Sequence, residues 1–99
     1  MIDMQATDKE FYDRADAFIR IANEQLNQSG QIPTNTSFMY AVCRFNAWVV
    51  ASGFEKQEEM KFAKAGALDY FVNQYKEMLD EHLDDYIANF DAYTEQQDA

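Results

Sequence analysis

The sequence predicts an all-α protein, a small antiparallel bundle of three main helices in which the last helix is long. Apolar residues recur at spacings of three and four along most of the chain, as the 3.6-residue turn of a helix requires. Gly and Pro, which interrupt helices, number only three and one among 99 residues. Cap and stop signals of helices stand at the ends of the apolar stripes. We expect a single domain over residues 1–99, with loose tails at 1–6 and 94–99.

The first helix is expected to begin at Thr7-Asp8-Lys9-Glu10, which has the form of a capping box. One face then carries a stripe of apolar side chains: Phe11, Ala15, Phe18, Ala22 and Leu26. Polar residues fall on the opposite side, as in a helix that covers a core. Ser29-Gly30 supplies a stop signal, and Pro33 is expected to keep the helix from continuing, so that QIPTN forms the connection.

The second helix is expected in the most apolar stretch of the chain, SFMYAVCRFNAWVVASGF, at residues 37–54. This stretch is shorter than the roughly 20 apolar residues that cross a bilayer, and a central Arg44 is costly in a membrane. A cap at residues 34–36 and a stop at Ser52-Gly53 bound the helix. It is apolar nearly all round, which is typical of a helix with neighbours on several sides.

The third helical segment runs from Glu55 to about Tyr93 without Pro and with a single Gly. Beyond residue 80 its apolar stripe shifts around the helix by roughly 70°. Two structures fit this shift. Either the helix breaks near residues 80 to 84 and a short fourth helix folds back, or one helix of about 60 Å outruns the others. In the second case an aromatic end stays exposed as a candidate interface: Leu83, Tyr86, Ile87, Phe90 and Tyr93.

The charge of the chain narrows the possible partners. Eight Lys and Arg against eighteen Asp and Glu leave a formal charge of -10. Such a charge disfavours binding to nucleic-acid phosphates and to anionic membranes. The single Cys43 cannot form an internal disulfide, and the polar start MIDMQATDKE lacks the pattern of a secretion signal. We therefore expect a cytoplasmic protein.

Three segments together resemble a family of small bacterial proteins known only as a domain of unknown function: FYDRADAFIRIANEQ, SFMYAVCRFNAWVVA and ALDYFVNQYKEMLDEHLDDYI. The likeness covers roughly residues 8 to 93. The matching residues are Phe11, Tyr12, Ala15 and Asp16 in the first segment, Arg44, Phe45 and Asn46 in the second, and Tyr70, Phe71, Tyr75, Met78, Leu79, Asp85 and Tyr86 in the third. These are packing residues rather than a catalytic signature. The resemblance implies a helical, cytoplasmic protein and says nothing about an activity.

Arg44 is the first candidate for a binding residue. A guanidinium within an apolar helix needs acceptors, and Asp16 or Asp69 could supply a carboxylate for an internal ion pair. The alternative is an anion pocket, in which Arg44 binds a ligand carboxylate or phosphate beside Tyr40 and Asn46. The ion pair is the preferred interpretation, because buried charges are normally paired within their own fold.

Four carboxylates on adjacent turns form a candidate metal site: Asp80, Glu81, Asp84 and Asp85. Their spacing matches neither the Glu-x-x-His di-iron pattern nor an EF-hand loop, so a solvated acidic face is the preferred interpretation. His82 and Cys43 stand on different helices, and Cys43 is expected to be an inert packing residue rather than a reactive thiol. Without a nucleophile–base pair, a phosphate-binding glycine loop or a zinc spacing, we expect no catalytic residue and no cofactor.

These features favour a non-enzymatic, acidic interaction protein that forms a homodimer through its C-terminal aromatic segment. Its negative surface would also suit a basic protein partner. The competing class is a small-ligand or metal-binding protein that uses Arg44, Asn46 and Tyr40, or the acidic cluster at residues 80–85.

Overall fold

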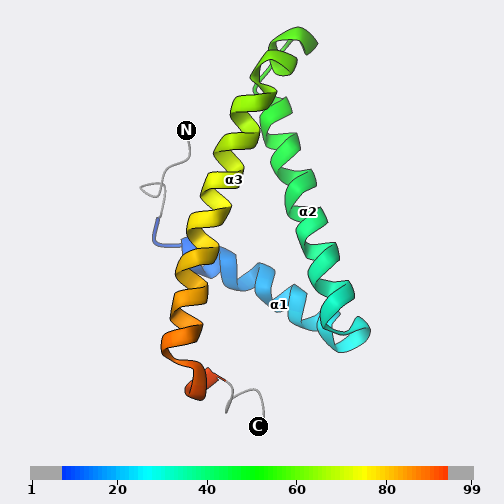
Figure 1. Cartoon of the computed structure of the whole chain (residues 1–99). Coiled ribbons are helices and arrows are strands. Elements are labelled where there is room, and N and C mark those ends of the chain that lie inside the picture. Colours follow the sequence, from blue (N-terminus) through cyan, green and yellow to red (C-terminus); the bar gives the residue numbers. More distant parts are fainter. Residues whose placement is uncertain (1–7, 94–99) are drawn as a thin grey trace. The chain divides into compact units, whose positions relative to one another are not determined.

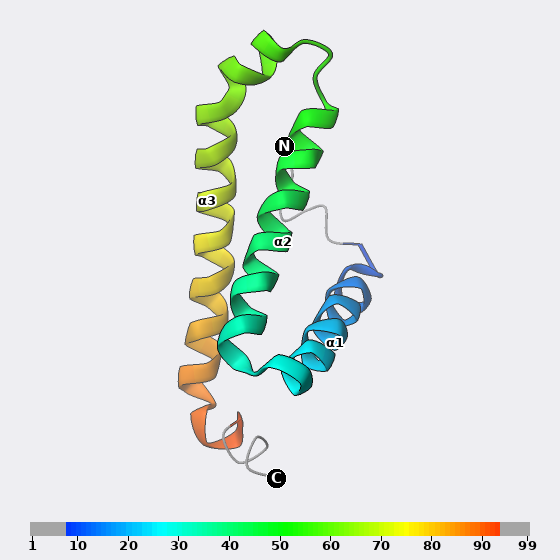
Figure 2. The same cartoon turned by 90° about the vertical axis from the view of Figure 1, so that its right-hand side faces the viewer.

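The computed structural model describes residues 8–93, which hold α-helices and no strand. The three main helices are α1 (Phe11–Ser29), α2 (Gln31–Ser52) and α3 (Gln57–Ala88), and a short helical turn follows at residues 90–93 (Figures 1 and 2). The predicted all-α fold, with three main helices and a short fourth one, is confirmed. The chain divides into two compact units between Val49 and Val50. The tails predicted at residues 1–6 and 94–99 lie outside the described residues.

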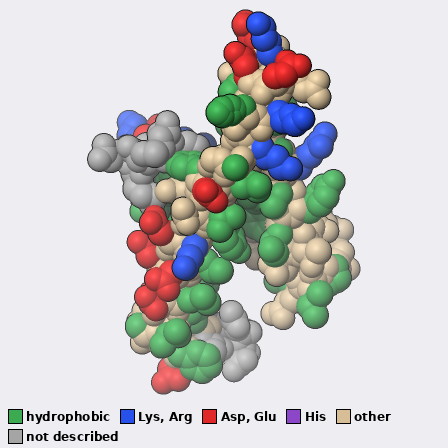
Figure 3. All heavy atoms as spheres, turned by 45° about the horizontal axis from the view of Figure 1, so that its top comes forward, with side chains coloured by type: hydrophobic (Ala, Val, Ile, Leu, Met, Phe, Trp, Pro, Cys, Tyr) green, Lys and Arg blue, Asp and Glu red, His purple; other side chains and the backbone are tan. Residues whose placement is uncertain are grey.

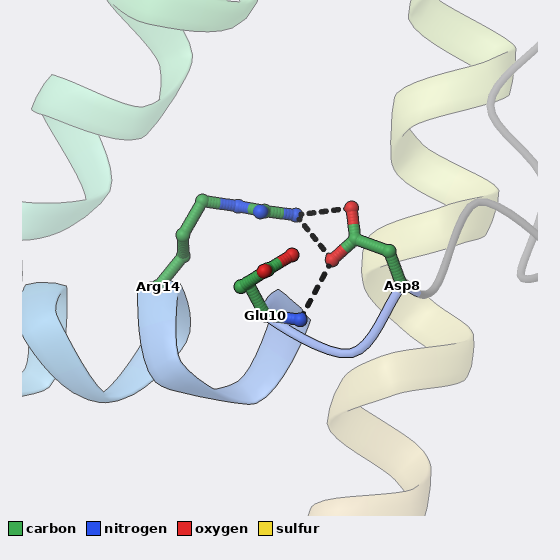
Figure 4. A network of polar contacts seen from close by, with 3 residues as sticks. All are labelled: Asp8, Glu10 and Arg14. Atoms are coloured by element: carbon green, nitrogen blue, oxygen red, sulfur yellow. Dashed lines mark hydrogen bonds and ion pairs between the residues drawn. The ribbon is translucent and has the colours of Figure 1, made fainter.

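Helix α1 begins after a turn that Asp8 organises (Figure 4). The Asp8 carboxylate accepts a hydrogen bond from the Glu10 amide at 3.0 Å, and its carbonyl accepts one from the Phe11 amide at 3.0 Å. Arg14 donates to both carboxylate oxygens at 3.3 Å. The Asp8 carboxylate takes the Glu10 amide that the predicted capping box assigns to Thr7, and the helix begins at Phe11. The other half of the box, from Glu10 to Thr7, stays a prediction. Thr7 lies outside the described residues.

A single residue, Gly30, joins α1 to α2. Its amide donates to the Leu26 carbonyl at 2.9 Å, and its carbonyl accepts from the Thr34 amide at 3.3 Å, so it ends one helix and starts the next. Gly30 has a φ of 85° and a ψ of 176°. The predicted QIPTN loop and the helix start at residues 34–36 are wrong. Pro33 stands in the first turn of α2, where a helix needs no amide donor.

Helix α2 ends at Ser52, as the sequence predicts. The turn after it is closed by hydrogen bonds from the Gly53 amide to the Val50 carbonyl at 3.1 Å and from the Phe54 amide to the Ala51 carbonyl at 3.2 Å. Helix α3 then begins at Gln57. The acidic residues in its first turn suit the positive end of the helix dipole.

Helix α3 runs unbroken through residues 80 to 84, so the break expected there as one alternative does not occur. The helix ends instead at Ala88, and Asn89 caps it. The Asn89 amide donates to the Asp85 carbonyl at 3.0 Å, and its side-chain nitrogen donates to the Asp85 carboxylate at 2.9 Å. Asn and Asp form such local hydrogen bonds readily, which favours a helix end at this position.

No side chain among the described residues is fully buried. Figure 3 shows hydrophobic side chains at the surface, interspersed with acidic ones. Helix α2 illustrates this exposure, because Phe45 is 62% exposed, Trp48 is 61% exposed, and Cys43 is exposed rather than packed as expected. Most of the stability of protein helices comes from covering such apolar faces, so these faces are candidate contact surfaces. None of the described helices combines the length and the hydropathy that a bilayer crossing requires.

Candidate functional site

One side of α3 carries a row of exposed apolar side chains, which we call the α3 stripe. Its members are Leu68, Val72, Tyr75, Leu79, Leu83 and Tyr86. Their spacings of four, three, four, four and three residues follow the helical period, so all six lie on the same side of the helix. Each is between 41% and 61% exposed. An apolar row of this length is a candidate surface for a protein contact.

The predicted interface falls partly within this stripe and partly beside it. Leu83 and Tyr86 are members, while Ile87, at 73% exposed, and Phe90, at 62% exposed, extend the apolar surface. Tyr93 turns back, and its ring lies 4.3 Å from the ring of Tyr86. The sequence interpretation missed the earlier members of the stripe. The signal for them is present, since the same spacing of three and four continues toward the helix start.

The end of α3 is held by hydrogen bonds that converge on Asp85, an arrangement that we call the C-terminal clasp. One carboxylate oxygen of Asp85 accepts from the Tyr93 hydroxyl at 2.7 Å, and the other accepts from the Asn89 side chain at 2.9 Å. The Asn89 side chain also donates to the Asp85 carbonyl at 3.1 Å. Ring contact between Tyr86 and Tyr93 completes the clasp. It fixes the short helix at residues 90–93 to the last turns of α3.

The clasp also bears on the predicted metal site. Both carboxylate oxygens of Asp85 are engaged, while Asp80, Glu81 and Asp84 are exposed on α3. Within residues 8–93, no three side chains of His, Cys, Asp or Glu are grouped so that they could hold a metal ion. The metal alternative therefore stays a prediction that the geometry of the described residues does not support.

The clasp predicts a pH effect on Tyr93. The hydrogen bond to Asp85 raises the pKa of Tyr93 above its usual value near 10, with smaller effects from desolvation and from the negative charge of Asp85. Because the folded-state pKa is raised, the bond stabilises the clasp below the unfolded value and is lost as the pH rises through the folded value. In a spectrophotometric titration, we expect Tyr93→Phe to remove a tyrosine that ionises late.

Asp85→Asn should shift the late ionisation of Tyr93 to lower pH, because the carboxylate no longer disfavours the phenolate. Tyr40→Phe is the control, since it removes a tyrosine without touching the clasp. A titration in which the late ionisation survives the Tyr93 substitution would contradict the hydrogen bond.

The residues of the predicted anion pocket all lie on α2, but not on one side of it. Tyr40 and Arg44 are one turn apart, whereas Asn46 lies about 160° around the helix from Arg44. Tyr40 is 73% exposed and Arg44 is exposed. Arg44 and Asp16 lie in the same compact unit, and no ion pair joins these two described residues. The pairing with Asp69, which lies in the other unit, stays a prediction.

A concavity among the described residues lies between α1 and α2. It is an open groove of about 350 Å³, and its lining residues are Phe18, Ile21, Ala22, Gln25, Ser29, Pro33, Thr34, Ser37, Phe38 and Ala41. None of these side chains is charged, so the groove offers no counter-ion for an anion or a metal. Tyr40, Arg44 and Asn46 take no part in it. A groove of this composition is suited to packing against another apolar surface.

Thr34 lines this groove, and its substitution tests whether the groove holds a water or a ligand. Its hydroxyl oxygen is inaccessible and has no hydrogen-bond partner within the described chain. An unsatisfied buried hydroxyl costs about 1–3 kcal/mol, so Thr34→Val should raise the melting temperature. Thr36→Val, at an exposed position of the same turn, is the control and should change it little. A lower melting temperature for Thr34→Val alone would show that a water or a ligand satisfies the hydroxyl.

Charge is divided unevenly along the segment that carries the α3 stripe. Residues 57–76 contain three lysines and three acids, whereas residues 77–93 contain six acids and neither lysine nor arginine. The first part is therefore neutral overall, and the second has a formal charge of -6. The C-terminal end of the stripe thus combines an apolar side with a strongly negative one.

Comparison with known proteins places this chain among proteins without an assigned activity. The sequence model of a family described as "Protein of unknown function (DUF3144)" matches residues 11–87. A solved structure, the NMR structure of the protein NB7890A from Shewanella sp, is similar with a TM-score of 0.71 and 42% identity. The match covers 91% of this chain and 96% of that chain. Among curated proteins, none matches.

Proposed function

This chain belongs to the family described as "Protein of unknown function (DUF3144)", as its sequence resemblance predicts, and on that premise we propose that it is a non-enzymatic interaction protein that self-associates through α3. The observation that carries the proposal is the α3 stripe, six exposed apolar side chains on one side of a single helix. Beyond Leu83 and Tyr86, the last members of the stripe, Ile87 and Phe90 extend this surface, and Tyr93 closes it through the clasp.

The length of α3 supports an additional partner. Its 32 residues rise by about 48 Å, whereas the 22 residues of α2 rise by about 33 Å and the 19 of α1 by about 29 Å. Neither helix is long enough to run beside the whole of α3. A second copy of the chain offers a helix of equal length with the same apolar side, and most soluble oligomers are formed in this way from identical chains.

The size of the stripe is sufficient for a stable contact. Full burial of one large apolar side chain contributes roughly 1.5–3 kcal/mol, and these side chains begin about half exposed. Six of them on each copy therefore contribute an amount comparable to the estimated 4–15 kcal/mol that association costs in lost freedom of motion. Aromatic side chains such as Tyr75 and Tyr86 are also those that interfaces select.

The charge of residues 77–93 bears on the kind of partner, and the exposed Cys43 bears on the location. The formal charge of -6 over residues 77–93 makes a basic protein surface the most suitable heterologous partner, and it disfavours nucleic acid and anionic membrane. An exposed and unpaired Cys43 suits a reducing compartment, so we propose a cytoplasmic location. No observation on the described residues favours the anion pocket or the metal site as a second function.

Sedimentation equilibrium of the untagged full chain, together with native mass spectrometry, tests the proposal. We expect a dimer whose population rises with protein concentration and which carries no added mass. A strictly monomeric chain at high concentration would contradict self-association. Extra mass retained on a monomer would favour the small-ligand or metal-binding alternative.

A further inference from the structure

We infer that two copies of this chain meet through their α3 stripes in antiparallel orientation, so that the acidic end of each α3 lies beside the lysine-bearing half of the other. This inference rests on the self-association proposed above and adds its direction. The occupant of the stripe is a second copy of the chain. The charges along α3 decide how that copy is oriented.

A parallel pair would place like charges together. The six acids of residues 77–93 on one copy would lie at the same level along the paired helices as the same six acids of the other, with no lysine or arginine in that segment. An antiparallel pair places those acids beside residues 57–76, which are neutral overall and contain Lys61, Lys64 and Lys76. Complementary charge along two paired helices commonly favours one orientation of the partner.

The positions of the lysines around the helix strengthen this inference. At 100° per residue, Lys61 falls in line with the centre of the α3 stripe, while Lys64 and Lys76 lie about 60° to either side of it. All three are exposed. In a parallel pair, Lys61 would face the same lysine of the other copy at the centre of the contact. An antiparallel pair avoids this repulsion.

The ends of the stripe fit the antiparallel pair as well. Lys61 and Lys64 precede the first member of the stripe, Leu68, by one to two turns. When two stripes overlap fully in opposite directions, Leu68 of one copy lies beside the partner's Tyr86. The two lysines then lie level with residues 90–93 of the partner, which contain Tyr93 and Asp91. An aromatic ring and carboxylates are both favourable neighbours for a lysine.

Distances between spin labels, measured by double electron–electron resonance, test the orientation. The full chain carries Cys43→Ser and one new cysteine, either Asn73→Cys or Ala88→Cys, both exposed and outside the stripe. In an antiparallel pair whose overlap is centred near residue 77, the two labels of one dimer are separated along the helix axis. This axial separation is about 33 Å for labels at residue 88 and about 12 Å for labels at residue 73. The antiparallel pair therefore gives a clearly longer distance at residue 88.

The possible outcomes separate this inference from the proposed function. A dimer with equal distances at the two positions, or a shorter one at residue 88, would overturn the antiparallel orientation and leave self-association standing. A monomer in sedimentation equilibrium, with no dipolar signal at either position, would overturn both. A longer distance at residue 88 supports both.

A charge exchange provides a second test that needs no label. Lys61→Glu combined with Lys64→Glu should weaken the dimer roughly tenfold at low salt, with a smaller effect at high salt, because attractive pairs become repulsive. Lys9→Glu with Arg20→Glu is the matched control, since it changes the charge equally at exposed positions of the other unit. Equal dissociation constants for the two double variants would contradict the antiparallel pairing.

Discussion

Leu83→Asp is expected to convert the proposed dimer to monomers while the chain keeps its helical content. Leu83 lies in the α3 stripe and is 52% exposed, so the change costs little within one copy. In the dimer it places an unpaired carboxylate in an apolar contact, at a cost of roughly 3–5 kcal/mol for each copy. We therefore expect the dissociation constant, measured by sedimentation equilibrium, to rise more than a hundredfold.

The control for this substitution is Asn73→Asp. It adds the same charge to α3 at an exposed position about 120° around the helix from the centre of the stripe. We expect its dissociation constant to remain within a few-fold of the wild-type value. If Leu83→Asp behaves in the same way as Asn73→Asp, the α3 stripe is not the surface through which the copies meet.

The substitution Gly30→Ala is expected to lower the melting temperature by roughly 10 °C. Gly30 joins α1 to α2 with a φ of 85° and a ψ of 176°, a conformation that is essentially restricted to glycine. A Cβ at this position would meet no atom within 4 Å, so the expected cost of about 1–3 kcal/mol comes from the backbone alone. Thermal unfolding followed by circular dichroism measures it.

Gly66→Ala is the matched control, because the same change of residue is expected to have the opposite sign. Gly66 lies inside α3, and a Cβ there also meets no atom within 4 Å. Replacing an interior helical glycine by alanine stabilises a helix by roughly 1 kcal/mol. A rise in melting temperature for Gly66→Ala and a fall for Gly30→Ala would support the described backbone. A rise for both would show that Gly30 does not need its positive φ.

Much of the fold could be predicted because its signals are local. The apolar spacing of three and four identifies the three main helices, and Ser29-Gly30 and Ser52-Gly53 mark two helix ends. The end of α3 could not be predicted in this way. It depends on Asp85, which accepts hydrogen bonds from residues four and eight positions later. A shift of the apolar stripe near residue 80 indicates a change of surroundings, and by itself it does not determine where the helix stops.

The candidate site was predictable in part. The aromatic end of α3 stands out in the sequence, and its extension to Leu68 and Val72 follows the same spacing. The anion pocket shows the limit of motif reading, since Arg44 and Asn46 are two positions apart in sequence and therefore point in different directions on a helix. The four carboxylates at residues 80–85 likewise share a segment, while Asp85 is occupied by the clasp.

The sequence by itself determined that this protein is helical and where α1 and α2 end. These properties depend on the 3.6-residue period and on the backbone freedom of glycine, and both act over a few residues. Only the tertiary structure decided that α2 begins before Pro33, that Gly30 alone makes the connection, and that Asp85 holds the end of α3. These outcomes depend on which donors and acceptors come within hydrogen-bond distance when the chain folds, and residue spacing does not specify that.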